Sequence, residues 1–242
     1  MRQLAYSLIV LATTTTVNAE SIFNFGSNNT VSSGKIIING KEVGESSGNY
    51  LKGSGKKTTV SRNVSNFERI KITGTVDLIY SKGRNHVEVT GDENIVNHIK
   101  TEVDSGVLEI YSDKHFATDM PITVTVSSPR LDGVIVDGSS DVALRNIRSE
   151  KFLIQLNGTG DISASGKVKS LTIDVFGSGD VNTRELIADN VEAKLNGTGD
   201  LYVTALQSLN ATVSGAGDIV YYGNPPVVNS NAFGAGDITS GD

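Results

Sequence analysis

Six aspartates in the second half of the chain have the residue type and the spacing to do chemistry. Each ends a Gly-x-Gly-Asp motif that is followed by an aliphatic residue, although Ser140 replaces the second glycine in the first copy. The aspartates recur at intervals of 18 to 20 residues and are Asp141, Asp161, Asp180, Asp200, Asp218 and Asp237. A regular row of carboxylates could bind calcium, or each carboxylate could accept hydrogen bonds from backbone N–H groups.

Calcium is the weaker of these two interpretations. The ion takes six to eight oxygen ligands, whereas each repeat supplies one carboxylate. If the repeats stack like paired strands, about 4.8 Å apart, neighbouring carboxylates repel by about 0.9 kcal/mol at a water-like dielectric constant. We therefore expect each aspartate to bond backbone N–H groups at its own glycine corner, in an Asx-type turn. The calcium ladder remains the alternative, and we expect no metal and no other cofactor.

The elements that position these residues are predicted by the period of the repeat. A period of about nineteen residues indicates a solenoid, in which each unit buries its apolar face against its neighbours. Within a repeat, Leu171, Ile173 and Val175 share one phase with the glycines that follow them, so a strand period of two runs through the motif. The connections are too short for helical crossovers. The sequence therefore predicts an all-β chain that forms a parallel β-helix with coils of about 19–20 residues.

Both glycines of each motif fall in the inward phase, where we expect no room for a side chain and a corner of the coil. These structural corner glycines are Gly158, Gly160, Gly177, Gly179, Gly197, Gly199, Gly215, Gly217, Gly234 and Gly236. The residue before the first glycine is in the outward phase. Phe176 and Phe233 stand at this position and are candidate contacts for a protein or glycan partner, unless the leader segment covers them.

The first half of the chain carries a weaker copy of the motif. In ITGTVDL, Val76 replaces the second glycine and Asp77 takes the place of the aspartate. The 64 residues from Asp77 to Asp141 leave room for about three coils and one insertion. Residues 93–103 are expected to include a short helical turn.

The beginning of the chain has the features of an export signal. Residues 1–19 carry one positive charge, an apolar run of nine residues and a small-residue cleavage pattern, which is typical of a signal peptide. No segment is long enough to span a membrane. A leader rich in Ser, Gly and Asn follows at residues 20–60, with a hairpin expected in KIIINGKEV. The β-helix domain is predicted over residues 61–242, with regular coils from about residue 131, in an exported protein of the periplasm or the extracellular space.

Composition excludes several functional classes. The chain has no cysteine, so it has no disulfide framework and no thiolate metal site. Its formal charge is -6 and its basic residues are scattered, which argues against nucleic acid as a partner. No serine lies in a nucleophile elbow, and the three histidines lack ligand spacing. We expect no catalytic residues.

Several separate motifs together resemble one protein family. The repeated G-[ST]-G-D-[IVL], preceded by NVSNFERIKITGTVDLIY, VEVTGDENI and IKTEVDSGVLEIY, is similar to the putative auto-transporter adhesin, head GIN domain proteins of bacteria. The resemblance covers residues 60–242 and implies a right-handed parallel β-helix that is exported. It supplies no catalytic residues. Ser140 and Val76 depart from the glycine pattern and make their coils less regular.

These observations favour a non-catalytic, exported β-helical interaction or adhesin-like module. The alternative is a polysaccharide-binding or polysaccharide-degrading β-helix enzyme, which would need carboxylates and a basic residue converging on one face. The basic residues Arg145, Arg148, Lys151 and Arg184 do not recur with a carboxylate pair at a fixed spacing. The partner is an unknown protein or glycan. An unpaired strand edge in the terminal coils predicts homo-oligomers, or capping of that edge by a partner or by the leader segment.

Overall fold

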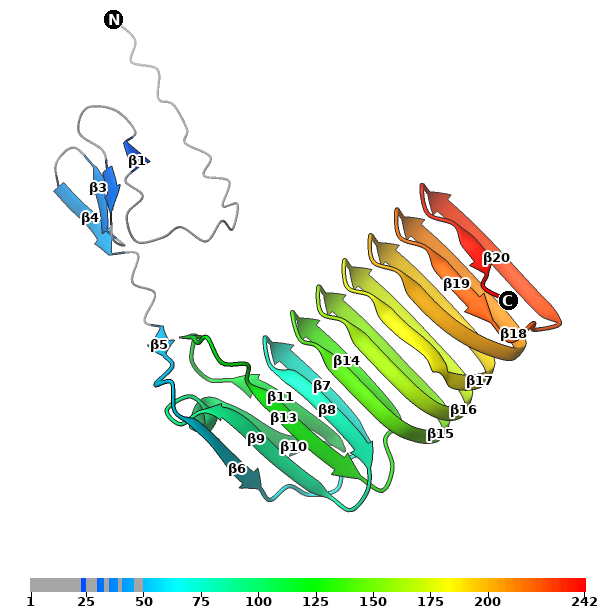
Figure 1. Ribbon diagram of the computed structural model, residues 1–242, viewed down its shortest axis with the longest axis horizontal. Coiled ribbons are helices and arrows are strands. Elements are labelled where there is room, and N and C mark those ends of the chain that lie inside the picture. The colour runs from blue at the N-terminus through cyan, green and yellow to red at the C-terminus, as the bar shows by residue number, and fades with distance from the viewer. Residues whose placement is uncertain (1–22, 25–29, 33–34, 39–40, 46–49) are drawn as a thin grey trace, which may run out of the picture. The chain divides into compact units, whose positions relative to one another are not determined.

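The computed structural model describes residues 23–24, 30–32, 35–38, 41–45 and 50–242. The chain divides into two compact units, residues 1–50 and 51–242 (Figure 1). The predicted signal peptide lies outside the described residues. Within the part that is described, no helix is both long and apolar enough to cross a membrane.

The first unit contains a small antiparallel sheet with the strand order β1-β2-β3-β4. Its strands are β1 (Phe23–Asn24), β2 (Thr30–Ser32), β3 (Lys35–Ile38) and β4 (Lys41–Glu45). Strands β3 and β4 pair antiparallel with Ile38 opposite Lys41. This pairing confirms the hairpin predicted in KIIINGKEV.

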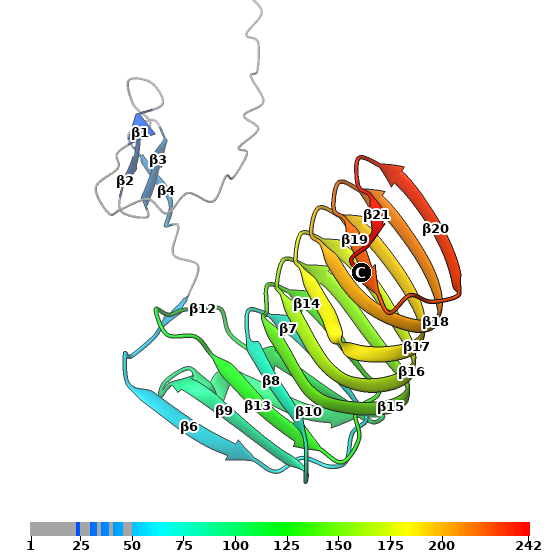
Figure 2. The same cartoon turned by 45° about the vertical axis from the view of Figure 1, so that its right-hand side comes forward.

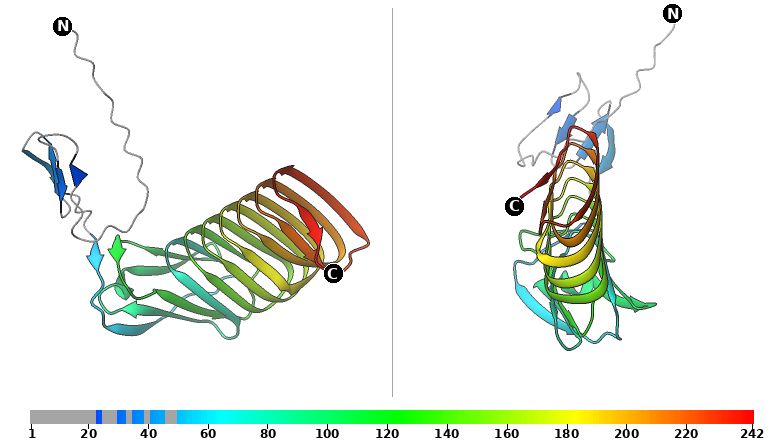
Figure 3. Two further views of the ribbon diagram at one scale, coloured as in Figure 1. Left: turned by 45° about the horizontal axis from the view of Figure 1, so that its top comes forward. Right: turned by 90° about the vertical axis from the view of Figure 1, so that its right-hand side faces the viewer.

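The second unit is the predicted parallel β-solenoid. Four long strands, each of which forms most of one coil, pair in parallel with the next in chain order (Figure 2). They are β15 (Val142–Gly158), β16 (Ile162–Gly177), β17 (Val181–Gly197) and β18 (Leu201–Gly215). The last coil consists of β19 (Ile219–Tyr222) and β20 (Val227–Gly234), and β21 (Ile238–Ser240) follows. Seen end-on, the coils are narrow and elongated (Figure 3).

Each coil contributes to two faces, which we call face A and face B. Face A is the stretch that follows the aspartate, such as residues 142–148, and face B is the stretch that leads into the next motif, such as residues 151–158. The strand register shifts at β-bulges between the two stretches. The alternation explains the packing, because Leu171, Ile173 and Val175 are buried and stack in register on the corresponding residues of the next coil. The core is thus a set of aliphatic columns between the two faces.

The N-terminal end of the solenoid corrects one expectation. Strands β14 (Gly133–Gly138) and β15 pair directly with β7 (Arg69–Gly74) and β8 (Asp77–Lys82). Asp77 and Asp141 therefore lie in neighbouring coils, and the prediction of about three coils between them is wrong. Residues 86–128, which lie between them in the chain, form strands on the other side of β7 and β8.

Two of these strands pair in parallel with β7 and β8 and so extend the two faces, whereas the others pair antiparallel. Strand β11 (Val107–Ser112) pairs with β7, and β13 (Thr123–Ser128) pairs with β8. The antiparallel strands β10 (Ile99–Asp104), β9 (His86–Asp92) and β6 (Lys57–Arg62) extend this end further. The 3₁₀ turn η1 (Val96–His98) confirms the predicted helical turn.

The solenoid unit also begins earlier in the chain than residue 61. Strand β5 (Leu51–Lys52) pairs with β12 (Phe116–Ala117), and β6 pairs with β9. Asp92 is buried here and accepts a hydrogen bond of 2.6 Å from the Gly55 N–H and another from the Thr118 hydroxyl. The Gly-Asp pair of VEVTGD therefore ties residues 53–55 to the solenoid rather than forming a coil corner.

Candidate functional site

The corner glycines let the backbones of neighbouring coils approach closely. A Cβ atom built on Gly158 would lie 1.7 Å from the carbonyl oxygen of Gly138, and one on Gly160 would lie 1.9 Å from that of Ser140. The corresponding distances at the later corners are between 1.7 and 2.3 Å. The second glycine of each motif is buried, whereas the first is less buried and in most coils has a positive φ. Each corner glycine thus lies close to the backbone of the preceding coil rather than to the opposite face of its own coil.

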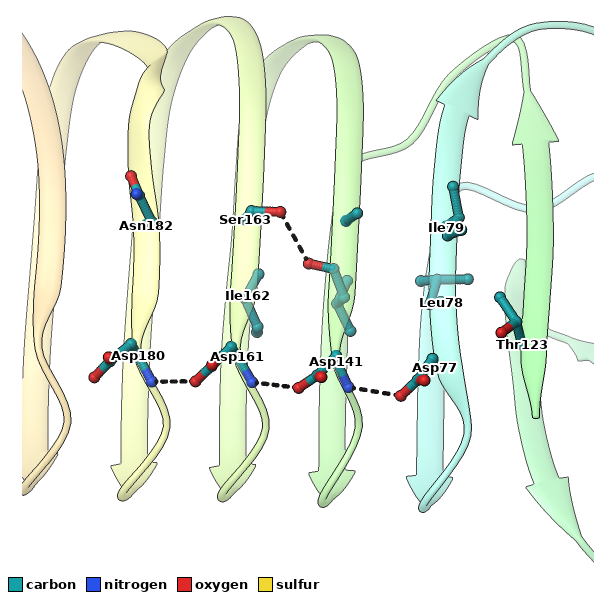
Figure 4. A pocket seen from close by; sticks show the side chains of 12 residues that line it. Asp77, Leu78, Ile79, Thr123, Asp141, Asp161, Ile162, Ser163, Asp180 and Asn182 are labelled. Atoms are coloured by element: carbon teal, nitrogen blue, oxygen red, sulfur yellow. Dashed lines mark hydrogen bonds between the residues drawn. The ribbon is translucent and has the colours of Figure 1, made fainter. Parts of the chain in front are cut away.

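The aspartates form a hydrogen-bonded ladder along one edge of the solenoid (Figure 4). In each rung, the backbone N–H of one aspartate donates to Oδ1 of the aspartate in the preceding coil. The N···O distance is 3.0 Å from Asp161 to Asp141 and 2.8 Å from Asp200 to Asp180. The first rung runs from Asp141 to Asp77 at 3.1 Å, and the last from Asp237 to Asp218 at 2.8 Å.

The ladder differs from the Asx-type turn that the sequence suggested. Each carboxylate bonds the corner of the next coil rather than its own corner, because in-register stacking places the N–H of the next aspartate beside it. Asp77 is the first acceptor of the row, and the sequence signal for it was the ITGTVDL copy. Hydrogen bonds from N–H groups stabilise the charged form of a carboxylate, which opposes the repulsion along the row.

The ladder does not gather metal ligands into a cluster. Among the described residues, no group of three or more His, Cys, Asp or Glu side chains could hold a metal ion. One carboxylate per coil leaves any ion between two coils short of the oxygen ligands that calcium takes.

A groove lies on face A next to the ladder, and it consists of two adjoining cavities. The first, of about 440 Å³, is lined by four ladder aspartates and by Ile79, Ser163 and Asn182 (Figure 4). The second, of about 400 Å³, shares Ser163 and Asn182 with the first and is lined also by Arg145 and Arg184. We call the two cavities together the face A groove.

The arginines of the groove come from β15 and β17. The Arg184 guanidinium carbon lies 4.1 Å from the centroid of the Tyr222 ring, a cation–π contact. Arg145 makes no ion pair with any residue of the described part of the chain. Beyond these two arginines, Arg148 and Lys167 line a further cavity of about 640 Å³. The structure thus gathers basic residues that looked scattered in the sequence.

Sequence reasoning missed this grouping because β-bulges shift the strands beside it. The register between β15 and β16 changes between Leu144 and Ile147, where Asn146 has a φ of 59°. Basic residues at irregular positions are thereby brought onto neighbouring coils. No period in the sequence marks them.

Tyr202 stands beside the groove. It is the register neighbour of Asn182 in the next coil. Burial, and then the charges of Asp200 and Asp180, raise the pKa of its phenol. A side-chain hydrogen bond with Asp200 raises this pKa further, so the hydroxyl is already engaged with the ladder.

The two candidate aromatic contacts are exposed on face B. The fractional exposure is 49% for Phe176 and 64% for Phe233. Strand register places both in one outward column, with Asn196 and Ser214 between them.

The comparisons with known proteins agree with this fold. Residues 66–225 match the family model described as putative auto-transporter adhesin, head GIN domain. No curated protein matches.

Crystal structures of three bacterial proteins are similar to the chain. A putative adhesin from Bacteroides fragilis has a TM-score of 0.67 and 24% identity, over 78% of this chain and 99% of that one. A putative adhesin from Parabacteroides distasonis has a TM-score of 0.50 and 22% identity, over 79% and 99%. A putative lipid binding protein from the same species has a TM-score of 0.47 and 21% identity, over 80% and 100%.

The first two of these structures share the solenoid fold with this chain. Their identity is low, so the assignment to a family rests on the family model, which matches more than half of the chain. The resemblance seen in the repeated motifs is confirmed, and the chain belongs to the putative auto-transporter adhesin, head GIN domain family.

Proposed function

We propose that the chain is a non-catalytic, exported, adhesin-like module that binds a protein or glycan through the outer surface of its coils. Family membership supports an adhesive role. The observation that carries the proposal is the outward column of face B, in which Phe176 and Phe233 are largely exposed. Three coil steps separate them, which corresponds to about 14 Å.

The solenoid suits such a role because it holds its surface residues rigidly. Each coil is fixed by backbone pairing to both neighbours, so the two phenylalanines have a constant separation. Aromatic side chains supply a large contact area at a low cost in conformational entropy. A partner that contacts both rings would gain from two anchors that are already in place.

A cell-binding experiment tests this proposal. The purified chain, fluorescently labelled, is titrated onto bacterial and epithelial cells and onto immobilised mucin. We expect saturable binding by the wild type. The affinity should fall about tenfold or more in the double variant Phe176→Ala/Phe233→Ala, because the loss of anchor residues has such an effect in other interfaces. Leu206→Ala is the matched control, because Leu206 is an exposed apolar residue at the bend between faces A and B, outside the phenylalanine column. Equal binding by the double variant and the wild type would reject the aromatic column as the contact.

The second candidate is an enzyme that degrades polysaccharides. The observation in its favour is that Arg145, Arg184 and Glu185 line one cavity of the face A groove. The chain is incubated with acidic and neutral polysaccharides, and new reducing ends and unsaturated products are measured. We expect none. Cleavage that is lost in Arg145→Ala would overturn the non-catalytic assignment.

Export is tested separately from binding. The intact chain and a variant that lacks residues 2–19 are expressed in a bacterium, and the cell fractions are compared. We expect the intact chain outside the cytoplasm with a shortened N-terminus, and the variant inside it. An intact chain that stays in the cytoplasm at full length would contradict the signal-peptide assignment.

A further inference from the structure

The face A groove is hollow because its floor has small side chains. Ala143 and Ser163 lie on adjacent coils in the register column that continues to Ile79 on one side and to Asn182 and Tyr202 on the other. Larger residues therefore flank a low centre. The volumes of about 440 and 400 Å³ fall within the range of small-molecule sites.

The two sides of the groove carry opposite charges. One side is the ladder, where Oδ1 of Asp141 and Oδ1 of Asp161 each accept an N–H from the next coil, and the Oδ2 atoms of these two residues take part in no hydrogen bond among the described residues. The other side holds Arg145, which has no ion-pair partner among the described residues, and Arg184, which is held against Tyr222. One side therefore offers acceptors, and the other offers guanidinium donors.

These features point to one chemical class of ligand. A guanidinium pairs with a carboxylate through two parallel hydrogen bonds. The aspartate oxygens accept hydrogen bonds from hydroxyl groups. Ser163 Oγ on the floor donates to the Val142 carbonyl oxygen and can accept a further hydrogen bond, and the amide nitrogen of Asn182 on the flank can donate one. A sugar that carries a carboxylate presents all of these groups on one compact ring.

The direction of the groove also fits a glycan. It runs across the strands, along the stacking axis, from Asp77 to Asp180 (Figure 4). These three coil steps correspond to about 14 Å. The sugar units of an extended oligosaccharide repeat at a spacing comparable to one coil step of about 4.8 Å. Successive sugars would therefore meet successive rungs of the ladder.

We infer that the face A groove binds an acidic oligosaccharide, with a sugar carboxylate on Arg145 and sugar hydroxyls on the ladder aspartates. This inference deepens the proposed function and rests on it. The net charge of -6 opposes a densely charged polyanion. The site therefore fits a glycan in which a single acidic sugar reaches Arg145.

The test uses oligosaccharides that differ only in the acid group. The full chain is titrated with an array of matched pairs, among them trigalacturonic acid and sialyllactose, each with its own methyl ester. We expect at least one acidic member to bind about tenfold or more tightly than its neutral ester, because the ester leaves Arg145 without its anion. The preference should weaken as salt increases.

Three variants locate the site. Arg145→Ala should remove most of the acid preference, whereas Arg145→Lys should keep part of it, because lysine retains the charge but not the fork. Ser163→Leu should block both cavities without changing the charge, since Ser163 lines both. Lys114→Ala is the control for a lost surface charge away from the groove. Circular dichroism and thermal melting check that each variant is folded.

The outcomes separate this inference from the proposed function. If no pair shows an acid preference, or if Arg145→Ala and Ser163→Leu bind like the wild type, the inference is wrong. It is also wrong if inorganic phosphate or vesicles of phosphatidylglycerol compete while no acidic sugar binds. Cell binding that persists in these groove variants but is lost in Phe176→Ala/Phe233→Ala would leave the proposed function standing without this groove.

Discussion

At the scale of single residues, the ladder turns six like charges into a row of hydrogen-bond acceptors. Each aspartate from Asp141 to Asp218 contributes to two rungs, as the donor of its N–H to one coil and as the acceptor for the other, whereas Asp77 only accepts in this row and Asp237 only donates. The loss of one side chain should leave a single corner N–H without its partner, and the rungs on either side should remain.

Asp180→Ala tests this role of the ladder. We expect the free energy of unfolding to fall by about 1 to 3 kcal/mol, because the N–H of Asp200 loses the acceptor that lies 2.8 Å away. Asp180→Asn keeps a side-chain oxygen and removes one charge from the row, so it should cost less than Asp180→Ala. Urea titrations of the three chains give the comparison. Equal stability of Asp180→Ala and the wild type would show that the rungs contribute nothing.

Chelation separates the ladder from a calcium site. We expect EDTA to leave the melting temperature of the wild type unchanged, because the carboxylates already bond backbone N–H groups. A fall of many degrees that added calcium restores would replace this interpretation with a metal ladder.

At the scale of the elements, stacking depends on the absence of side chains at the corners. We expect Gly179→Ala to cost about 3 kcal/mol or more, because its Cβ would lie 2.0 Å from the carbonyl oxygen of Gly160 and the coils would have to separate. Gly55→Ala is the comparison, since Gly55 has a φ of +73° but open space around it. It should cost about 1 kcal/mol from backbone strain alone. Thermal or urea melts that rank the two variants in the opposite order would contradict the close approach.

The antiparallel end of the solenoid provides a pH-dependent contact. Asp113 accepts hydrogen bonds from Lys100 Nζ at 2.9 Å and from His98 Nδ1 at 2.8 Å, and these lower the pKa of its carboxyl group. A carboxyl group with a lowered pKa stabilises the folded state above its unfolded pKa, and this contribution is lost as the pH falls through the folded pKa.

We therefore expect Asp113→Asn to be less stable than the wild type at neutral pH, with a difference that shrinks once the pH falls below about 4. Urea midpoints measured from pH 7 to pH 3 give the difference between the two chains. The other carboxyl groups titrate in both chains, so the difference isolates Asp113. A difference that is constant with pH would show that the contact is not ionic.

The regular coils could be predicted from the sequence because each coil contains its own corner motif and its own alternation. The antiparallel end could not, because strands β9 and β10 show the same period of two as the coils and alternation does not encode strand direction. The row of aspartates was predicted from the repeat, but their hydrogen bonds depend on the order in which the coils stack.

The grouping of Arg145 and Arg184 depends on the positions of β-bulges, and these positions do not recur at a fixed interval in the sequence.

At the scale of the whole solenoid unit, one terminal strand has an open edge among the described residues. Strand β20 pairs with β18 on one side, and all of its residues are exposed. An antiparallel second copy centred on Ser230 would place Val227 opposite Phe233 and Val228 opposite Ala232, which keeps outward residues with outward residues. Such a contact has two-fold symmetry and uses the same strand from both copies.

We propose that the chain forms a dimer through β20, and we expect Val228→Lys to shift it towards the monomer because each copy would bring a charge into the pairing. Analytical ultracentrifugation over a range of concentrations measures the change, and Leu206→Lys, which adds the same charge away from β20, is the control. A wild-type chain that is monomeric at the highest soluble concentration would refute this arrangement.

The ladder has a direction, and this bears on the order in which the chain folds. In every rung the carboxylate belongs to the earlier coil and the N–H to the later one. Because synthesis proceeds from the N-terminus, each newly made coil meets a template whose acceptor is already in place. The solenoid can therefore assemble vectorially, with Asp77 as its starting point. A nascent chain stopped after any coil would hold a shorter but complete stack, whereas a chain without β7 and β8 would lack its seed.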